Sequence, residues 1–165
     1  MTDSKVGLTA DIVEKPAMRI VGFGRIFTWA EMGEIPGLWQ LAGPWLEAET
    51  GSMTAESFGA MFVAPEGTGD FGYIAGIDMA VDFELTPDLM ELRIQPGSFA
   101  IFPHNGGLAD WPKTIWAVQE EWLPSSGHVR ADLVPGSVSI MERYGPGFDP
   151  QTGLGDMQCW LPLKS

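Results

Sequence analysis

Glu142 is the side chain of this sequence whose position most requires a chemical explanation. It stands in the segment VSIMERY, residues 138–144, whose residues alternate as they do in a strand. Alternate residues of a strand share a face. The residues expected on the same face as Glu142 are Val138, Ile140 and Tyr144. Because a carboxylate on a buried face costs several kcal/mol unless it is paired, hydrated or liganded, we expect Glu142 to have a specific partner.

Three kinds of partner suit this carboxylate. The first is an arginine, and the candidates are Arg93, Arg130 and Arg143. Arg143 is the least suited because it points to the opposite face of the strand. The second is a cationic ligand, for which Glu142 would be the counter-ion. The third is a reacting electrophile: burial raises a carboxyl pKa toward neutrality, so Glu142 could act as a general acid or base with Tyr144 or Tyr73 as hydrogen-bond partner.

The histidines and the cysteine offer little further chemistry. His104, in FPHNGG, lies at an expected strand end, where a hydrogen bond that structures the loop is its simplest role. His128 is expected at the surface, and Cys159 is expected to be a buried structural thiol. Two histidines and one cysteine do not cluster at ligand spacing, so no metal site is expected. No motif calls for a cofactor.

The composition is that of an acidic globular chain. With 165 residues, 45% of them hydrophobic and 19% charged, the sequence fits a single domain over residues 1–165. The net charge of -13 would repel phosphate backbones, so direct nucleic-acid binding is not expected. No apolar run approaches the ~18 residues of a membrane span. A lone cysteine without a secretion signal indicates the reducing cytoplasm.

The elements that position these residues follow an order that repeats. Residues 1–4 are interpreted as a loose N-terminal segment. The predicted strand regions are residues 11–29, 58–64, 71–83, 90–106, 137–145 and 157–164. Helices are predicted from about 35 to 49 and from about 109 to 123. Pro44 is expected to kink the first helix and Pro124 to end the second. Each half, about 11–84 and 90–164, therefore reads strand, helix, strand, strand.

A sequence echo supports an internal duplication. Both helices spell W-x5-W-L, in residues 39–46 and 116–123, and each is soon followed by a glycine, Gly51 or Gly127. Duplicated halves usually pack about a pseudo-two-fold axis. We therefore predict an α+β fold in which both helices lie on one face of a shared antiparallel sheet.

The helical periodicity also gives some tryptophans a special position. The residues expected to seat the helices on the sheet are Leu38, Leu41 and Trp45 in the first helix and Trp111, Ile115, Val118 and Trp122 in the second. Trp39 and Trp116 project away from these stripes, and Leu46 lies on the same side as Trp39. We expect both tryptophans to face the groove between the helices. A dimer contact, and a simple cap on the core edge, are the alternatives.

Several stretches together resemble a known family. They are YIAGIDM (73–79), IQPGSFAIFPHNGG (94–107), WPKTIWAVQEEWLPSSG (111–127) and MERYGPGFDP (141–150). They resemble the GyrI-like small-molecule-binding family, whose domain also forms the effector-binding half of bacterial multidrug-responsive transcription regulators. The likeness covers nearly the whole chain in order. Only about ten residues precede the first strand, so the sequence resembles a stand-alone member rather than one with an upstream helix-turn-helix domain.

The resemblance implies a duplicated strand-helix-strand-strand fold, the SHS2 duplication, with an aromatic cleft between its helices and a glutamate on a late strand at its floor. Glu142 occupies the place of that glutamate, and Trp116 matches a helix aromatic of the family. Trp39, Tyr73 and Trp160 are added to the ligand-binding set from the expected geometry alone.

Three functions follow from these expectations. The first is binding of a hydrophobic, cationic or multidrug-type small molecule in the cleft. The second is hydrolysis of strained, cyclopropane-bearing natural products, with Glu142 and Tyr144 as catalytic residues, because some relatives are associated with that reaction. The third is a protein-interaction role such as inhibition of a larger enzyme. The partner expected in the first two is a small molecule, and a homodimer is a further option.

Overall fold

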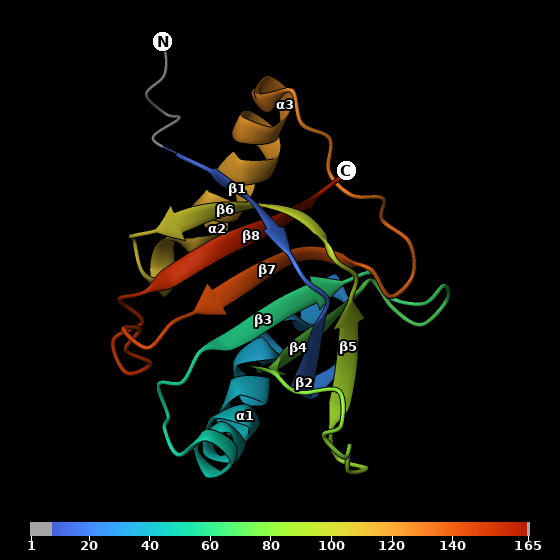
Figure 1. Cartoon of the computed structure of the whole chain (residues 1–165), viewed down its shortest axis with the longest axis vertical. Coiled ribbons are helices and arrows are strands. Elements are labelled where there is room, and N and C mark those ends of the chain that lie inside the picture. The colour runs from blue at the N-terminus through green and yellow to red at the C-terminus, as the bar shows by residue number, and fades with distance from the viewer. Residues whose placement is uncertain (1–7, 165) are drawn as a thin grey trace.

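The computed structural model describes residues 8–164, so the segment 1–4 lies outside the described residues. The strands are β1 (Asp11–Lys15), β2 (Met18–Phe27), β3 (Ser57–Phe62), β4 (Phe71–Asp78), β5 (Met90–Ile94), β6 (Gly97–His104), β7 (Val138–Tyr144) and β8 (Met157–Leu163). They form one sheet in the order β1-β6-β8-β7-β3-β4-β2-β5, and every neighbouring pair is antiparallel. In Figure 1 the helical segments lie at opposite ends of the view, with the strands between them.

The strand order confirms the predicted duplication. Each strand has a counterpart in the other half: β1 and β5, β2 and β6, β3 and β7, β4 and β8. When every strand is replaced by its counterpart, the strand order reads the same from the opposite edge of the sheet. The halves meet where β3 pairs with β7. Each half also gives its first strand to the other, because β1 pairs with β6 and β5 pairs with β2. The fold is therefore an α+β fold whose two units are interwoven rather than merely side by side.

Helix α1 (Ile35–Thr50) agrees with the predicted first helix in its bounds but not in its rotation. Pro36 stands in its first turn, where a missing N–H costs nothing, and Gly51 ends it with a left-handed φ of 82°. The side chains it buries are Leu38, Ala42 and Leu46. Leu41, predicted to seat the helix, is instead 57% exposed. The stripe is therefore rotated by one position, so the small Ala42 lets the helix lie close to the sheet.

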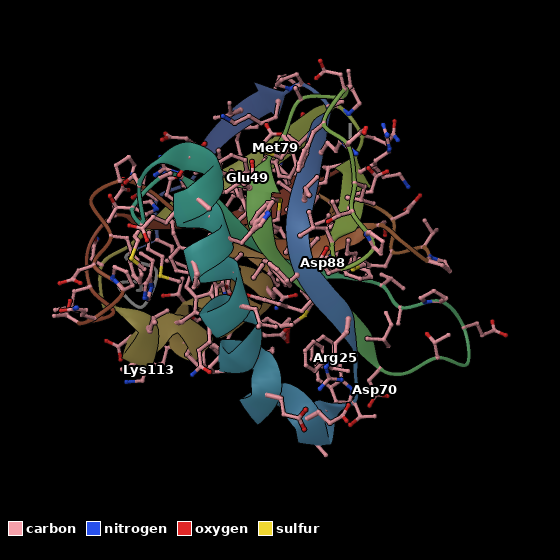
Figure 2. The ribbon with its side chains drawn as sticks, turned by 90° about the horizontal axis from the view of Figure 1, so that it is seen from below. Arg25, Glu49, Asp70, Met79, Asp88 and Lys113 are labelled. Carbon is pink, nitrogen blue, oxygen red and sulfur yellow. The ribbon has the colours of Figure 1, made fainter. Side chains whose placement is uncertain are left out.

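A short 3-10 segment, η2 (Trp29–Glu34), leads into α1. Its first backbone N–H, that of Trp29, donates to the carboxylate of Asp70 at 2.9 Å, and Arg25 forms an ion pair with Glu34. Figure 2 shows Arg25 and Asp70 near the N-terminal end of this helical segment, and Glu49 near the C-terminal end of α1. These polar contacts attach the N-terminal end of α1 to β2 and to the loop before β4.

The second helical region runs past the predicted stop at Pro124. It consists of η3 (Leu108–Asp110), α2 (Trp111–Ala117), the π-helical turn η4 (Val118–Trp122) and α3 (Leu123–Ser126), with Gly127 at φ 79° as its end. In a helix Pro124 cannot donate to the carbonyl four residues earlier. The π turn widens the helix just before the proline, so the chain continues for one more turn. The predicted seating stripe is confirmed: Val118 is fully buried, and the other three residues pack around it.

Strand β7 carries a bulge that corrects one expected side-chain direction. Met61 pairs with Ile140 but Phe62 pairs with Val138, so Ser139 is an extra residue. Ile140 packs with the helix-side core around Val118. Val138 joins Met141 in the core on the other face of the sheet. Val138 therefore does not share a face with Glu142, contrary to the expectation from simple alternation.

No helix within residues 8–164 is long and apolar enough to cross a membrane.

Candidate functional site

A cavity of about 460 Å³ opens on the helix-bearing face of the sheet. One wall is the face of α1 that carries Trp39 and Leu46, and the opposite wall is formed by Leu108 and the loop that follows β7. The floor consists of strand residues from β3, β4 and β7. The complete set of lining residues is Ile35, Pro36, Trp39, Gln40, Gly43, Leu46, Met53, Thr54, Ala55, Ser57, Tyr73, Leu108, Glu142, Tyr144, Gly145, Phe148 and Pro150.

Glu142 lies in the floor of this cavity and is held by two tyrosines. The hydroxyl of Tyr73 donates to Glu142 Oε1 at 2.7 Å, and the hydroxyl of Tyr144 donates to the same oxygen at 2.6 Å. The indole N–H of Trp39 donates to Tyr73 Oη at 2.9 Å. A chain of hydrogen bonds therefore runs from the α1 wall across the sheet to the carboxylate, and Oε2 stays outside the tyrosine contacts.

The aromatic rings continue from these hydrogen bonds into the far wall. The rings of Trp39 and Tyr144 meet edge to face with centroids 5.2 Å apart. Phe148, in the loop after β7, lies with its centroid 4.7 Å from that of Tyr144. Three aromatic side chains thus form a continuous surface from α1 to the loop, with Glu142 at its base.

Gly59 makes the contact between Tyr73 and Glu142 sterically feasible. Strand β3 lies between β4, which carries Tyr73, and β7, which carries Glu142. Gly59 is directly opposite Glu142 in the register. A Cβ atom at Gly59 would lie 2.0 Å from Tyr73 Oη and 2.5 Å from Glu142 Oε1, and contacts this short do not occur between real atoms. The tyrosine hydroxyl therefore occupies the space that any other residue at position 59 would need.

The surroundings raise the pKa of Glu142. Burial is the largest cause because it disfavours the charged carboxylate, while hydrogen bonds from Tyr144, Tyr73 and Trp111 act in the opposite direction. Burial, followed by the charge of Glu142, raises the pKa of Tyr73 and of Tyr144 well above the ordinary value. Both tyrosines therefore remain protonated donors at neutral pH. The residue Glu142 keeps some accessible surface, because it lines the cavity.

No cationic side chain of residues 8–164 forms an ion pair with Glu142. Arg93 pairs with Glu91 at 3.0 Å. Arg130 donates to the side chain of Gln119 and to the carbonyl of Ser139. Arg143 pairs with Glu56 and Asp156. The three arginines that the sequence offered as partners are thus engaged elsewhere, and the carboxylate instead accepts hydrogen bonds from tyrosine and tryptophan side chains.

Of the five residues predicted to bind a ligand, three line the cavity: Glu142, Trp39 and Tyr73. Tyr144, predicted for catalysis, lines it too. Trp116 lies outside the cavity and is 57% exposed, because among the described residues the second helical region contributes only Leu108, before α2, to the walls.

Trp160 also lies outside the cavity, on the opposite face of the sheet. Glu142 pairs with Cys159, so the next residue, Trp160, points the other way. There it packs against Phe58 and Phe99 and lines a second hollow, where the ammonium of Lys15 is 4.8 Å from its ring centroid. The expected position of Trp160 beside Glu142 is therefore corrected by the strand register.

Several residues of the cavity were not predicted from the sequence. Phe148 follows MERY within GPGFDP, a segment whose glycines and prolines gave no strand or helix pattern. Ser57 and Gly59 lie at alternate positions of β3 and face the same side of the sheet as Glu142. The sequence does not show this, because it does not give the register in which β3 pairs with β7. Met53 comes from the connection between α1 and β3, where no periodicity applies. The missed residues are thus those that only tertiary contacts bring to the site.

The remaining chemistry-bearing residues have structural positions. His104 is buried, its Nδ1 lies 2.7 Å from Thr114 Oγ1, and its Nε2 lies 2.5 Å from the Gly107 carbonyl oxygen. The loop-structuring role expected for it is confirmed. Burial raises the pKa of the Cys159 thiol, which is free and fully enclosed. Within residues 8–164 no three His, Cys, Asp or Glu side chains gather in a way that could hold a metal ion.

The structure is thus an interwoven, duplicated α+β fold with a cavity over its central strands. The model of the GyrI-like small molecule binding domain matches residues 9–145. The chain belongs to this family of small-molecule-binding domains. No match to the chain is found among curated proteins.

Solved structures with the same fold support this assignment. SAV2435, bound to tetraphenylphosphonium, is similar with a TM-score of 0.63 and 14% identity, over 95% of this chain and 94% of that chain. An integron cassette protein from the mobile metagenome of Vibrio cholerae is similar with a TM-score of 0.61 and 18% identity, over 96% and 99%. The C-terminal domain of EcmrR gives 0.61 and 14%, over 96% and 99%. At these identities the likeness concerns the fold.

Proposed function

We propose that this domain binds lipophilic cations in the cavity, with Glu142 as their counter-ion. The observation that carries the proposal is a carboxylate in the floor of a roomy aromatic cavity, without an ion pair to any cationic side chain of residues 8–164. Glu142 is the cavity's ionisable carboxylate, and the other titratable lining groups, Tyr73 and Tyr144, are neutral donors. A single positive charge on the ligand would compensate it.

The walls favour ligands with a large apolar surface. A volume of about 460 Å³ lies within the range of small-molecule sites, about 300–1,000 Å³. Ring faces of tryptophan and tyrosine attract cations by about 0.5–2 kcal/mol per contact, and stacking area adds to this. The net charge of -13 also draws cations toward the molecule. The ligand bound to SAV2435, tetraphenylphosphonium, has both properties, a delocalised positive charge and apolar rings.

Calorimetric titration with tetraphenylphosphonium and with neutral triphenylphosphine oxide tests the proposal. The cation is expected to bind more tightly than the neutral compound. Glu142→Gln keeps the shape and an oxygen acceptor but removes the charge, so it is expected to weaken binding of the cation by about tenfold or more, which is about 1.4 kcal/mol, with little effect on the neutral compound. Equal binding of the cation by a folded Glu142→Gln variant contradicts the counter-ion role.

The same carboxyl supports a second candidate function, hydrolysis of strained electrophiles. The specific observation is that Glu142, with a raised pKa, shares hydrogen bonds with two tyrosine hydroxyls inside a cavity. A carboxyl whose pKa is raised toward neutrality can take a proton from an attacking water and return it to a leaving group. Mass spectrometry of cyclopropane-bearing electrophiles incubated with the protein distinguishes the two functions, because a binding protein returns them unchanged.

A further inference from the structure

Ser57 carries a hydroxyl group that forms no hydrogen bond with any residue of the segment 8–164. The residue is only 6% exposed, and it lines the cavity. Within residues 8–164, Arg130 Nε is the one side-chain nitrogen or oxygen atom that is fully enclosed and has no hydrogen-bond partner. The Ser57 hydroxyl also has no partner among these residues, so it cannot be fully enclosed. It therefore retains contact with solvent. Because the residue is otherwise buried, the solvent reaches it through the cavity.

Strand pairing places this hydroxyl close to the carboxylate. Ser57 is directly opposite Tyr144, and Gly59 is directly opposite Glu142. Residues two apart on a strand share a face, so Ser57 and Glu142 are diagonal neighbours on the face that bears the cavity. Such neighbours have their Cα atoms about 7–8 Å apart, with Cβ atoms somewhat closer. A ligand group bound between them can contact both.

A ligand that fills this corner must replace the solvent on Ser57. A serine hydroxyl can donate and accept, and a buried polar group left unpaired weakens binding. The ligand group nearest Glu142 is positively charged, and two kinds of organic cation differ at this point. A protonated amine has an N–H that can donate to Ser57 Oγ, whereas a quaternary onium ion presents only C–H groups.

We propose that Ser57 is a specificity-determining residue which makes the cavity select protonated amines over quaternary onium ions of the same shape. In the bound state the charge of the amine faces Glu142, and its N–H donates to the oxygen of Ser57. The inference rests on the proposed function, since it takes Glu142 as the counter-ion. It goes further by assigning the chemistry of the head group, which the aromatic walls do not determine.

Calorimetry at pH 7 with dimethyl(naphthylmethyl)amine and its quaternary analogue trimethyl(naphthylmethyl)ammonium tests this inference. The amine is protonated at that pH, so the two probes share charge and ring, and the quaternary probe has a methyl group where the amine has its N–H. The wild-type protein is expected to bind the amine about five- to tenfold more tightly. Ser57→Ala is expected to reduce this ratio to about one, through weaker binding of the amine. Affinity for the quaternary probe should stay within about twofold of the wild-type value, because it makes no hydrogen bond to Ser57.

Ser125→Ala is the matched control. Ser125, in α3, does not line the cavity, and its hydroxyl donates to the carbonyl oxygen of Glu121 at 2.8 Å, so this variant should keep the wild-type ratio. If the wild-type protein binds the two probes with equal affinity, the role of Ser57 is overturned. If Glu142→Gln also lowers both affinities, the proposed cation site is still supported. A ratio that survives Ser57→Ala overturns the role of Ser57 too. If neither probe binds, or Glu142→Gln changes nothing, the proposed function fails and the inference fails with it. A wild-type ratio of about one overturns the role of Ser57 even if a variant does not fold. A wild-type preference for the amine supports that role only if it is lost in Ser57→Ala or, should that variant not fold, in Ser57→Gly, which also lacks the hydroxyl.

Discussion

At the scale of single residues, Glu142 combines two properties that oppose each other. Burial disfavours its charge, and two tyrosine hydroxyls on one oxygen favour it. The net effect of the surroundings is a raised pKa. The cavity thus holds a carboxyl group that is costly to ionise, and a bound cation would offset that cost. Part of the affinity for a cation would therefore come from relief of an unfavourable state of the protein.

The raised pKa predicts a pH-dependent stability that depends on Glu142. As pH rises above the ordinary value of 4.5, the unfolded chain loses this proton before the folded protein does. The free energy of unfolding therefore falls until the folded carboxyl also ionises, and the cost is absent below the unfolded pKa. Glu142→Gln removes this titration. Thermal melts between pH 4 and 8 should show the variant gaining Tm relative to wild type as pH rises. A Tm difference that is the same at every pH would contradict the prediction.

At the scale of elements, the arrangement of three neighbouring strands brings the site together. Tyr73 of β4 reaches Glu142 of β7 only by crossing the intervening strand β3 at Gly59. The length of a tyrosine suits this span, and a glycine is needed beneath it. The hydrogen bond from Trp39 then fastens α1 to the same point. Strand order, strand register and one missing side chain are therefore as much a part of the site as the glutamate.

Replacement of Gly59 by alanine tests this dependence. The new methyl group would displace the Tyr73 hydroxyl, and loss of its hydrogen bond raises the pKa of Glu142 further. Affinity for tetraphenylphosphonium at neutral pH should fall by about five- to tenfold, equivalent to one hydrogen bond of about 1–1.4 kcal/mol. The pH at which binding is half-maximal should move upward. Calorimetry across a pH series measures both.

Two comparisons make the Gly59→Ala result specific. Gly97→Ala introduces a methyl group in β6, where no atom lies within 4 Å of the new carbon, so binding should not change. Tyr73→Phe removes the hydroxyl itself, so adding Gly59→Ala to it should cost less than Gly59→Ala costs in the wild-type protein. The remaining loss would come from the contact of the new methyl group with Glu142 Oε1. Fully additive losses in the double variant would show that Gly59 does not act through the tyrosine hydroxyl.

Elements also show where prediction from the sequence reaches its limit. Glu142 could be placed because strand alternation and the family resemblance both point to it. Tyr144 was placed by strand alternation, and Tyr73 by the expected geometry alone. Trp160 could not, because its face relative to Glu142 depends on the register of β8 against β7. Leu41 was predicted to be buried against the sheet, but Ala42 is buried there and Leu41 is exposed. The rotation of the helix is set by close packing, which favours a small residue at the contact. The π turn before Pro124 and the bulge at Ser139 each change a local period that the sequence pattern assumes to be constant.

At the scale of the whole molecule, the exchanged edge strands tie the halves together. The W-x5-W-L echo predicted the duplication, and the mirrored strand order confirms it. What the repeat could not reveal is that β1 and β5 each pair with the other half. The cavity also uses both halves, because Trp39 and Tyr73 come from the first and Glu142 and Tyr144 from the second. A stable site therefore requires that the two halves fold as one unit.

This interweaving predicts that a destabilising substitution in one half lowers the free energy of unfolding of both halves equally. Phe102, in β6, is fully buried and packs edge to face on Trp122 with centroids 4.9 Å apart. Phe102→Ala should lower the free energy of unfolding by about 3–5 kcal/mol. Because β6 also holds β1 of the first half, native-state hydrogen exchange should show the slowest amides of β4, in the first half, losing the same free energy as those of β8. If β4 kept its wild-type protection while β8 lost it, the halves would be independent folding units. The shared cavity would then be an interface between two domains rather than part of a single core.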